Sequence, residues 1–136
     1  VELAAYLHDF SYVMDHTDFI HHETKGMALA EKLLRQFNYS ADKLEKVKLC
    51  ILNHSTISRA CSSSPEEFCI ANADVMSLIA RPDYWIKSSP LTRQMQDNSR
   101  WYFEQIEKSW PYMMDSARAV VEDKYNELMR NASLEV

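Results

Sequence analysis

The sequence has very few of the residues that form tight turns. Its 136 residues include one glycine and four prolines. An all-β fold needs many tight turns and a phosphate-binding loop needs several glycines, so this composition disfavours both and favours long helices joined by short loops. With 46% hydrophobic residues the chain can fill one core. We therefore predict an all-α fold and a single domain over residues 1–136.

The sequence also lacks closely spaced cysteine pairs, runs of basic residues and long apolar runs. The cysteines, Cys50, Cys61 and Cys69, form no CxxC pair, which favours reduced thiols and a cytoplasmic location. The chain has 20 acidic and 15 basic residues and no run of Lys or Arg, which argues against a nucleic-acid polymer as partner. No apolar run approaches the roughly 20 residues that a membrane helix needs, so we expect no membrane span. Nothing in the sequence indicates an oligomeric state.

Apolar residues recur at spacings of three and four, which predicts about six helices. Ser40 is a candidate N-cap, and Ser64, Pro65 and Glu67 have the spacing of a capping box. The chain opens inside a helical pattern with no start signal, so we expect a natural N-terminal helix to be absent. The predicted helices cover residues 2–13, 22–37, 41–54, 65–81 and 90–110, with a last helix after residue 111.

Five ionisable residues fall on or beside the apolar faces of these helices. An unpaired carboxylate or imidazole at such a position costs several kcal/mol unless something neutralises it. Imidazole nitrogen and carboxylate oxygen are ligands for divalent metal ions, and a carboxylate can bridge two of them. The sequence therefore predicts a metal centre made of His8, Asp9, His22, His54 and Asp74.

Each member of this set also has an ordinary structural interpretation. His8 or His54 alone would be read as a hydrogen-bonded core histidine, and Asp74 alone as an internal cap or an ion-pair partner. Five such exceptions on the inward faces of four helices in one small domain would be unusual, which favours the metal centre. His21 is an alternative to His22, but the spacing of the apolar residues that follow favours His22 as the inward residue.

The order and context of these residues resemble the HD superfamily of metal-dependent phosphohydrolases. The similarity runs through Leu7-His8-Asp9, the helix start from His22 to Ala28, the helix end from Ile51 to His54, and Ala73-Asp74. It covers roughly residues 1–80. The family pattern is His, His-Asp, His, His, Asp on an α-helical bundle, and this sequence contains everything after the first His. A Lys that often follows His-Asp in the family is also missing, because Phe10-Ser11-Tyr12 stands there.

The resemblance implies a helical bundle of the HD type that hydrolyses a phosphate ester or anhydride of a nucleotide or another small metabolite. It implies one or two divalent ions (Mn, Mg, Fe, Ni or Zn). Asp9 would be shared between the metals, His8 and Asp74 would bind the first together with the missing upstream His, and His22 and His54 would bind the second. Asp9, His22 and His54 would then be the catalytic residues.

Other assignments stay open. Lys25 and Arg59 lie near the predicted metals in the sequence and could bind the substrate phosphate, although both are also typical solvated surface charges. The absent first His means that either the natural start of the domain is missing or the site is degenerate. Two alternatives to the hydrolase follow: a di-iron oxygenase of the HD type, and a non-catalytic sensor or interaction domain.

Overall fold

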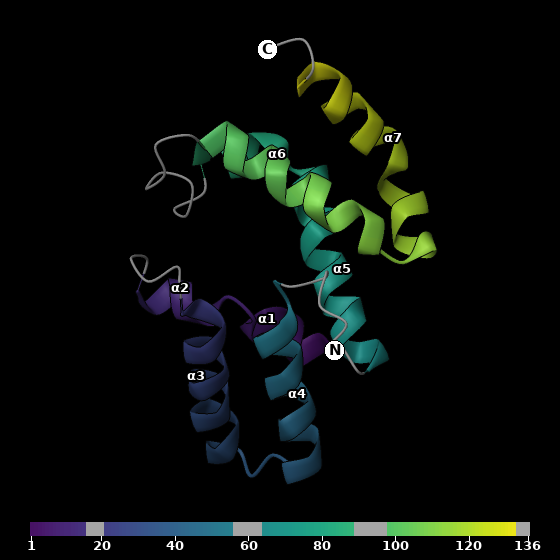
Figure 1. Cartoon of the computed structure of the whole chain (residues 1–136). Helices are drawn as coiled ribbons and strands as arrows, with labels where there is room; N and C mark the ends of the chain where they lie inside the picture. The colour runs from purple at the N-terminus through teal and green to yellow at the C-terminus, as the bar shows by residue number, and fades with distance from the viewer. Residues whose placement is uncertain (16–20, 56–63, 89–97, 133–136) are drawn as a thin grey trace. The chain divides into compact units, whose positions relative to one another are not determined.

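A computed structural model describes residues 1–15, 21–55, 64–88 and 98–132 of the chain (Figure 1). Within these ranges there is no strand, and the predicted all-α fold of about six helices is confirmed. A π-helical turn η1 (Tyr84–Ser88) and a 3-10 turn η3 (Trp110–Tyr112) accompany the α-helices. The α-helices are α1 (Glu2–Leu7), α2 (Phe10–Met14), α3 (His22–Gln36), α4 (Ala41–Asn53), α5 (Pro65–Ala80), α6 (Asn98–Ser109) and α7 (Asp115–Ala132).

The chain divides into two compact units, unit 1 (Val1–Ala71) and unit 2 (Asn72–Val136). The boundary falls inside α5, so that the first part of this helix belongs to unit 1 and the rest to unit 2. The single domain expected over residues 1–136 stays a prediction. None of the helices in the described ranges is long and apolar enough to cross a membrane.

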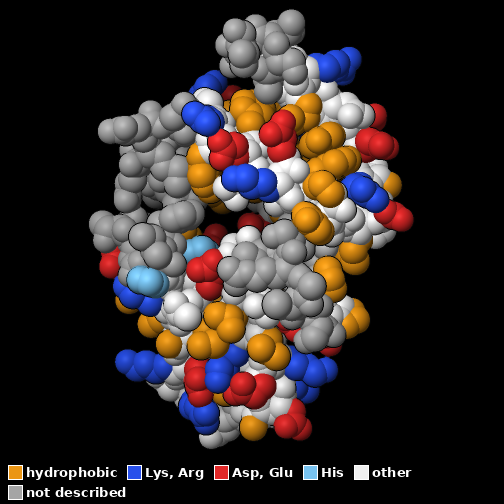
Figure 2. Space-filling model, viewed as in Figure 1, with side chains coloured by type: hydrophobic (Ala, Val, Ile, Leu, Met, Phe, Trp, Pro, Cys, Tyr) orange, Lys and Arg blue, Asp and Glu red, His pale blue; other side chains and the backbone are white. Residues whose placement is uncertain are grey.

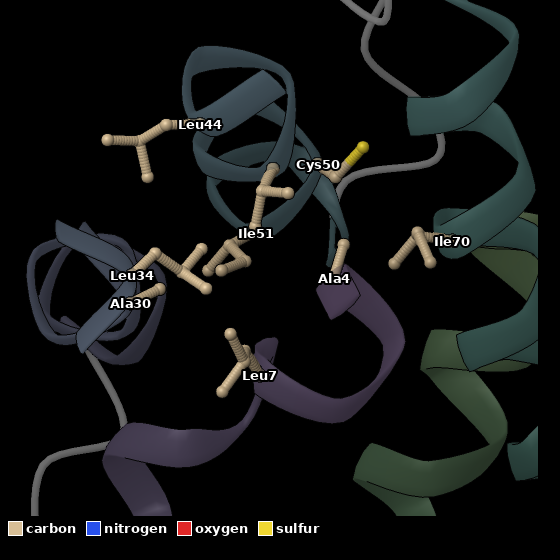
Figure 3. Packing of buried hydrophobic residues seen from close by; sticks show 9 residues of the cluster. Ala4, Leu7, Ala30, Leu34, Leu44, Cys50, Ile51 and Ile70 are labelled. Carbon is tan, nitrogen blue, oxygen red and sulfur yellow. The ribbon is translucent and has the colours of Figure 1, made fainter. Parts of the chain in front are cut away.

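The core of unit 1 forms where α3 and α4 pack as an antiparallel pair against α1. Ile51 of α4 is fully buried, and Ala30, Leu34 and Leu7 point toward it from the two neighbouring helices (Figure 3). Burial of such apolar side chains stabilises a fold by roughly 1.5–3 kcal/mol each. The full cluster is Ala4, Leu7, Ala30, Leu34, Leu44, Val47, Cys50, Ile51 and Ile70.

A short loop reverses the chain between α3 and α4. Asn38 has a φ angle of 52°, a left-handed conformation that asparagine tolerates better than most residues. The side chain of Ser40 then accepts a hydrogen bond from the backbone N–H of Lys43, so the predicted N-cap of α4 is confirmed. This loop fixes α4 beside α3 and thereby brings the end of α4 close to the beginning of α3.

The prediction of one continuous helix over residues 2–13 is wrong. The chain forms α1 and α2 instead, and His8 and Asp9 lie at the junction between them. Asp9 has φ −102° and ψ 14°, outside the helical region, which interrupts the ladder of helical hydrogen bonds. The segment is also not buried all round, because only Ala4 and Leu7 of α1 are buried and Tyr6 is 78% exposed.

The beginning of α5 is tied to the end of α4 by a buried carboxylate. Ser64 Oγ accepts a hydrogen bond from the backbone N–H of Glu67 and donates one to Glu67 Oε1, so the predicted Ser–Glu cap is present. The second oxygen of Glu67 accepts a hydrogen bond of 2.7 Å from Asn53 Nδ2. Since Asn53 is the last residue of α4, this contact fixes the helix end that carries His54.

Unit 2 contains the rest of α5 together with α6 and α7. The hydroxyl of the fully buried Tyr102 donates a hydrogen bond of 2.7 Å to the carbonyl of Leu78. Buried Asn72 accepts a hydrogen bond from the backbone N–H of Met114. The apolar spacing of Met114 with Ala117 and Val121 predicts that Met114 lies on the inward face of the last helix, and this is wrong, because Met113 is buried and Met114 is exposed. The predicted start, near residue 90, of the helix expected over residues 90–110 lies outside the described residues.

The surface charges of unit 1 are mixed in sign. Glu31 forms ion pairs with Arg35 and Lys48, and Lys48 also pairs with Glu45. On the face drawn in Figure 2, basic and acidic side chains are likewise interspersed rather than gathered by sign. Exposed pairs of this kind contribute roughly 0–1 kcal/mol each.

Candidate metal centre

The junction between α1 and α2 carries the first two candidate ligands. His8 follows the last residue of α1, and its Nδ1 atom lies 2.8 Å from the carbonyl oxygen of Ala5. Its other ring nitrogen, Nε2, lies 3.4 Å from Oδ2 of Asp9. The break in the helix at these two residues therefore lets neighbouring side chains face each other.

His54 approaches the same carboxylate from the end of α4. Its side chain is 2% exposed, its Nδ1 atom lies 2.6 Å from the carbonyl oxygen of Ile51, and its Nε2 atom lies 3.5 Å from Oδ1 of Asp9. The rings of His8 and His54 meet edge to face with centroids 4.8 Å apart. One ligand atom from each of His8, Asp9 and His54 lies within 4.8 Å of the others, close enough for one ion to contact all three.

His22 lies beside this cluster at the beginning of α3. It is buried, and its Nε2 atom is 3.3 Å from Nε2 of His54. Tyr12 stacks on its ring with centroids 4.8 Å apart, and Ser11 Oγ donates a hydrogen bond to its backbone carbonyl. His21 precedes the helix and is exposed, so His22 is the inward residue of the two, as the spacing predicts.

Hydrogen bonding fixes which nitrogen of each imidazole has the lone pair. A carbonyl oxygen only accepts hydrogen bonds, so the Nδ1 atoms of His8 and His54 carry the hydrogens that Ala5 and Ile51 accept. In a neutral imidazole the Nε2 atom then has the lone pair. Both Nε2 atoms face the Asp9 carboxylate, which when ionised also only accepts. Such an arrangement is repulsive unless a cation, either a proton or a metal ion, lies within it.

Asp9 is an anion in this environment. Burial by itself raises the pKa of Asp9, but when His54 and His8 carry a proton on Nε2, their hydrogen bonds to Asp9 and their positive charge outweigh burial. Together they hold the pKa of Asp9 well below its ordinary value of 3.8. The carboxylate therefore supplies the negative charge that a divalent cation requires.

Gly26, the only glycine in the sequence, lets these elements come close together. A Cβ atom at this position would lie 3.1 Å from the carbonyl oxygen of His8 and 3.3 Å from Cγ2 of Ile51. Both distances are shorter than ordinary van der Waals contact. The absence of a side chain on α3 thus allows the backbone at His8 to pack directly against this helix.

The remaining predicted residues are Asp74, Lys25 and Arg59. Asp74 is half-buried in α5 and belongs to unit 2, so its role as a ligand stays a prediction. Lys25 is exposed on α3, and its role in substrate binding likewise stays a prediction. Arg59 lies outside the described residues. The structure thus brings together four of the five predicted ligands: His8, Asp9, His22 and His54.

Sequence reasoning missed Glu23, a neighbour of the cluster. Its Oε2 atom lies 3.2 Å from Nδ1 of His22, and its Oε1 atom accepts a hydrogen bond from the hydroxyl of Ser55. Adjacent residues of a helix usually point in different directions, so the position of Glu23 next to His22 gave no signal for this contact.

Comparison of the chain with protein-family models, with curated proteins and with solved structures gives no match.

Proposed function

We propose that this chain is a metal-dependent phosphohydrolase of the HD type, acting on a phosphate ester or anhydride of a nucleotide or another small metabolite. The observation that carries the proposal is the cluster of His8, Asp9 and His54, whose ligand atoms lie within 4.8 Å of one another. The Nε2 atoms of His8 and His54 both face the Asp9 carboxylate, an arrangement that a cation would stabilise. The order of these residues along the chain is also that of the HD pattern.

The donor atoms fit a divalent ion. Two imidazole nitrogens and one carboxylate oxygen suit Mn²⁺, Fe²⁺, Ni²⁺ and Zn²⁺, and the carboxylate also suits Mg²⁺. Hydrogen bonds from Nδ1 to backbone carbonyls orient the rings of His8 and His54, as outer contacts do for metal-binding histidines. The chain therefore holds these donors in position without help from the ion.

Exposure gives the cluster a closed side and an open side. His54 is 2% exposed, whereas His8 is 25% and Asp9 is 38% exposed. A catalytic metal site keeps a position open for water or substrate, whereas a structural site is closed. The gradient from His54 to Asp9 favours a catalytic site that water and a small substrate reach from the side of Asp9.

The negative charge of the cluster also favours a catalytic metal site. Without a cation, the carboxylates of Asp9 and Glu23 would repel an anionic phosphate, and no Lys or Arg contacts them within the described residues. A bound divalent ion would offset the charge of the phosphoryl oxygens and lower the pKa of a water molecule toward neutrality. His22, whose Nε2 atom faces His54, would either bind a second ion or transfer a proton. Lys25 and Arg59 are the proposed phosphate contacts, and Asp74 is the proposed further ligand.

The test combines metal analysis with a substrate screen. The full chain is stripped with chelator, reloaded separately with Mn²⁺, Mg²⁺, Fe²⁺, Ni²⁺ or Zn²⁺, and assayed for phosphate release from a panel of phosphorylated metabolites. We expect turnover that depends on the metal and is lost in Asp9→Asn. Asp42→Asn, at an exposed position in the first turn of α4, is the control and should retain turnover. Equal turnover in excess chelator, or an unchanged metal content and rate in Asp9→Asn, would overturn the proposal.

The same samples separate the other two candidate functions. Two irons after anaerobic purification, with dioxygen consumed and no phosphate released, would replace the hydrolase by an oxygenase. A chain that binds none of the five ions would be a non-catalytic domain.

A further inference from the structure

The short helix α2 contacts His22 at two places. The hydroxyl of Ser11, which is 4% exposed, donates a hydrogen bond of 2.9 Å to the backbone carbonyl of His22. The ring of Tyr12 stacks on the imidazole, with centroids 4.8 Å apart and planes inclined by 23°. The backbone and the side chain of His22 are therefore both contacted by neighbouring residues of one element.

The same turn of the chain carries a candidate metal ligand. Asp9 is the N-cap of α2, and its carbonyl accepts a hydrogen bond of 2.9 Å from the backbone N–H of Tyr12. The Asp9 carboxylate faces His54. The Tyr12 ring stacks on His22. The helix break at Asp9 thus places a ligand and an aromatic face against two different histidines of the site.

The stack leaves the edge of the imidazole open to other contacts. Stacked rings touch through their faces, whereas the nitrogen atoms of an imidazole form hydrogen bonds at its edge. Nε2 of His22 lies 3.3 Å from Nε2 of His54, and the two rings meet edge to face with planes inclined by 80°. A stacked tyrosine can therefore hold the His22 ring without competing for either nitrogen, whichever groups these nitrogens contact.

We propose that Tyr12 is a positioning residue whose aromatic face fixes the plane of the His22 ring and so directs Nε2 of His22 to His54. The torsion that turns an imidazole about its bond to Cβ has broad energy wells, so outside contacts must select one orientation. Functional side chains keep a productive geometry when packing locks their rotamers. The proposal rests on the proposed function in so far as the group that His22 serves is a metal centre.

Two variants separate the stack from ordinary apolar packing. Tyr12→Phe removes the hydroxyl and keeps the aromatic face, whereas Tyr12→Leu keeps an apolar side chain and removes the face. Tyr39→Leu is the matched control. Tyr39 is also partly buried and packs on the core of unit 1, but it follows the far end of α3, roughly 20 Å from His22 along the helix.

The first measurement uses the metal-free full chain with isotope-labelled histidine, at one alkaline pH for all variants. The His22 signals are those that are missing in His22→Gln. An aromatic ring displaces protons above its face upfield. The His22 ring protons should therefore lie upfield in the wild type, in Tyr12→Phe and in Tyr39→Leu, and return downfield in Tyr12→Leu.

The orientation of His22 is measured by the nuclear Overhauser contact between its ring protons and those of His54. Because the Nε2 atoms are 3.3 Å apart, the ring protons beside them lie near each other. The contact should be present in the wild type and in Tyr12→Phe and be weakened or lost in Tyr12→Leu. A wild type without the upfield shift, or an undiminished contact in Tyr12→Leu, would overturn the proposal. If circular dichroism shows that Tyr12→Leu is unfolded, Tyr12→Met replaces it, because methionine fills irregular gaps.

The second measurement is calorimetric titration with Zn²⁺. Nε2 of His22 either binds the ion or holds His54, and both roles need its position. Tyr12→Leu should therefore bind Zn²⁺ roughly 10-fold more weakly than the wild type, at the low end of the range for loss of an outer contact. Tyr12→Phe and Tyr39→Leu should bind as the wild type does.

The outcomes distinguish this inference from the proposed function. If the wild type binds no metal ion, the proposed function fails, while the upfield shift and the Overhauser contact still support or overturn the positioning of His22 by Tyr12. If the wild type binds Zn²⁺ and Tyr12→Leu binds it equally well, the role of Tyr12 at the metal centre is overturned and the proposed function stands.

Discussion

The Nε2 atoms of His22 and His54 lie 3.3 Å apart, although 32 residues separate them in the sequence. Each ring is held at its far side, His22 by Glu23 and His54 by the carbonyl of Ile51. Because the Nδ1 hydrogen of His54 is bonded to Ile51, Nε2 of His54 accepts in this contact and Nε2 of His22 donates. The stability and the binding properties of unit 1 should both depend on this arrangement.

Gly26→Ala should destabilise the chain even though alanine is the better helix former. Alanine gains roughly 0.5–1 kcal/mol over glycine inside a helix. The added Cβ would lie 3.1 Å from the backbone oxygen of His8, and overpacking of this kind costs roughly 1–3 kcal/mol. We expect the free energy of unfolding, measured with urea, to fall by about 1 kcal/mol.

Ala28→Gly is the control, because it measures what the difference between alanine and glycine costs at an exposed position of the same helix. It should cost about 1 kcal/mol. If Gly26→Ala were more stable than the wild type, the close approach of His8 to α3 would be refuted.

Glu67→Ala should be far more damaging than the same change at its neighbour Glu66. Glu67 is 2% exposed and bonds both Ser64 and Asn53, which are half-buried, so its replacement removes both of these hydrogen bonds. We expect a cost of about 1–3 kcal/mol in urea unfolding. Glu66 forms a surface pair with Lys46 at 3.5 Å, and its replacement should cost about 0–1 kcal/mol. Equal costs for the two variants would contradict the buried link between α4 and α5.

The depressed pKa of Asp9 predicts a particular dependence of stability on pH in the chelated chain. Because the folded-state pKa lies below the unfolded value of 3.8, folding favours the ionised carboxylate. The stabilisation is complete above that value and is lost as the pH falls through the lower folded-state pKa. We therefore expect the difference in free energy of unfolding between the wild type and Asp9→Asn, measured with urea, to become smaller as the pH is lowered through this range. A difference that stays constant would mean that Asp9 is not held as an anion by His8 and His54.

Much of the fold could be predicted from local signals. The side chains of Ser40 and Ser64 mark two helix starts, and the residue before Pro82 marks a helix end, because capping and proline act within a few residues. The break at Asp9 could not be predicted, since the apolar pattern of residues 2–13 suits one helix as well as two. The choice between Met113 and Met114 was missed because it depends on how η3 turns the chain.

The candidate site could be predicted only in part, because some of its contacts form only when the helices pack together. His8, Asp9, His22 and His54 could be picked out because ionisable residues on apolar faces are exceptional. Their partners could not, because Glu23 reaches His22 from the adjacent position and Ser55 only after α3 and α4 have packed together. The ligand role of Asp74 stays a prediction.

The adjacent histidines at the beginning of α3 offer the closest matched pair in the chain. His22 is 6% exposed and lies beside the cluster, whereas His21 is exposed and its side chain makes no capping hydrogen bond at the helix start. His22→Gln should therefore weaken Zn²⁺ binding by more than roughly 100-fold if His22 is a ligand, beyond the loss of an outer contact. His21→Gln should bind as the wild type does. Calorimetry on the two variants, with circular dichroism to check their folding, measures both. A larger loss in His21→Gln would reverse the assignment, because the exposed ring would then be the one that binds the ion.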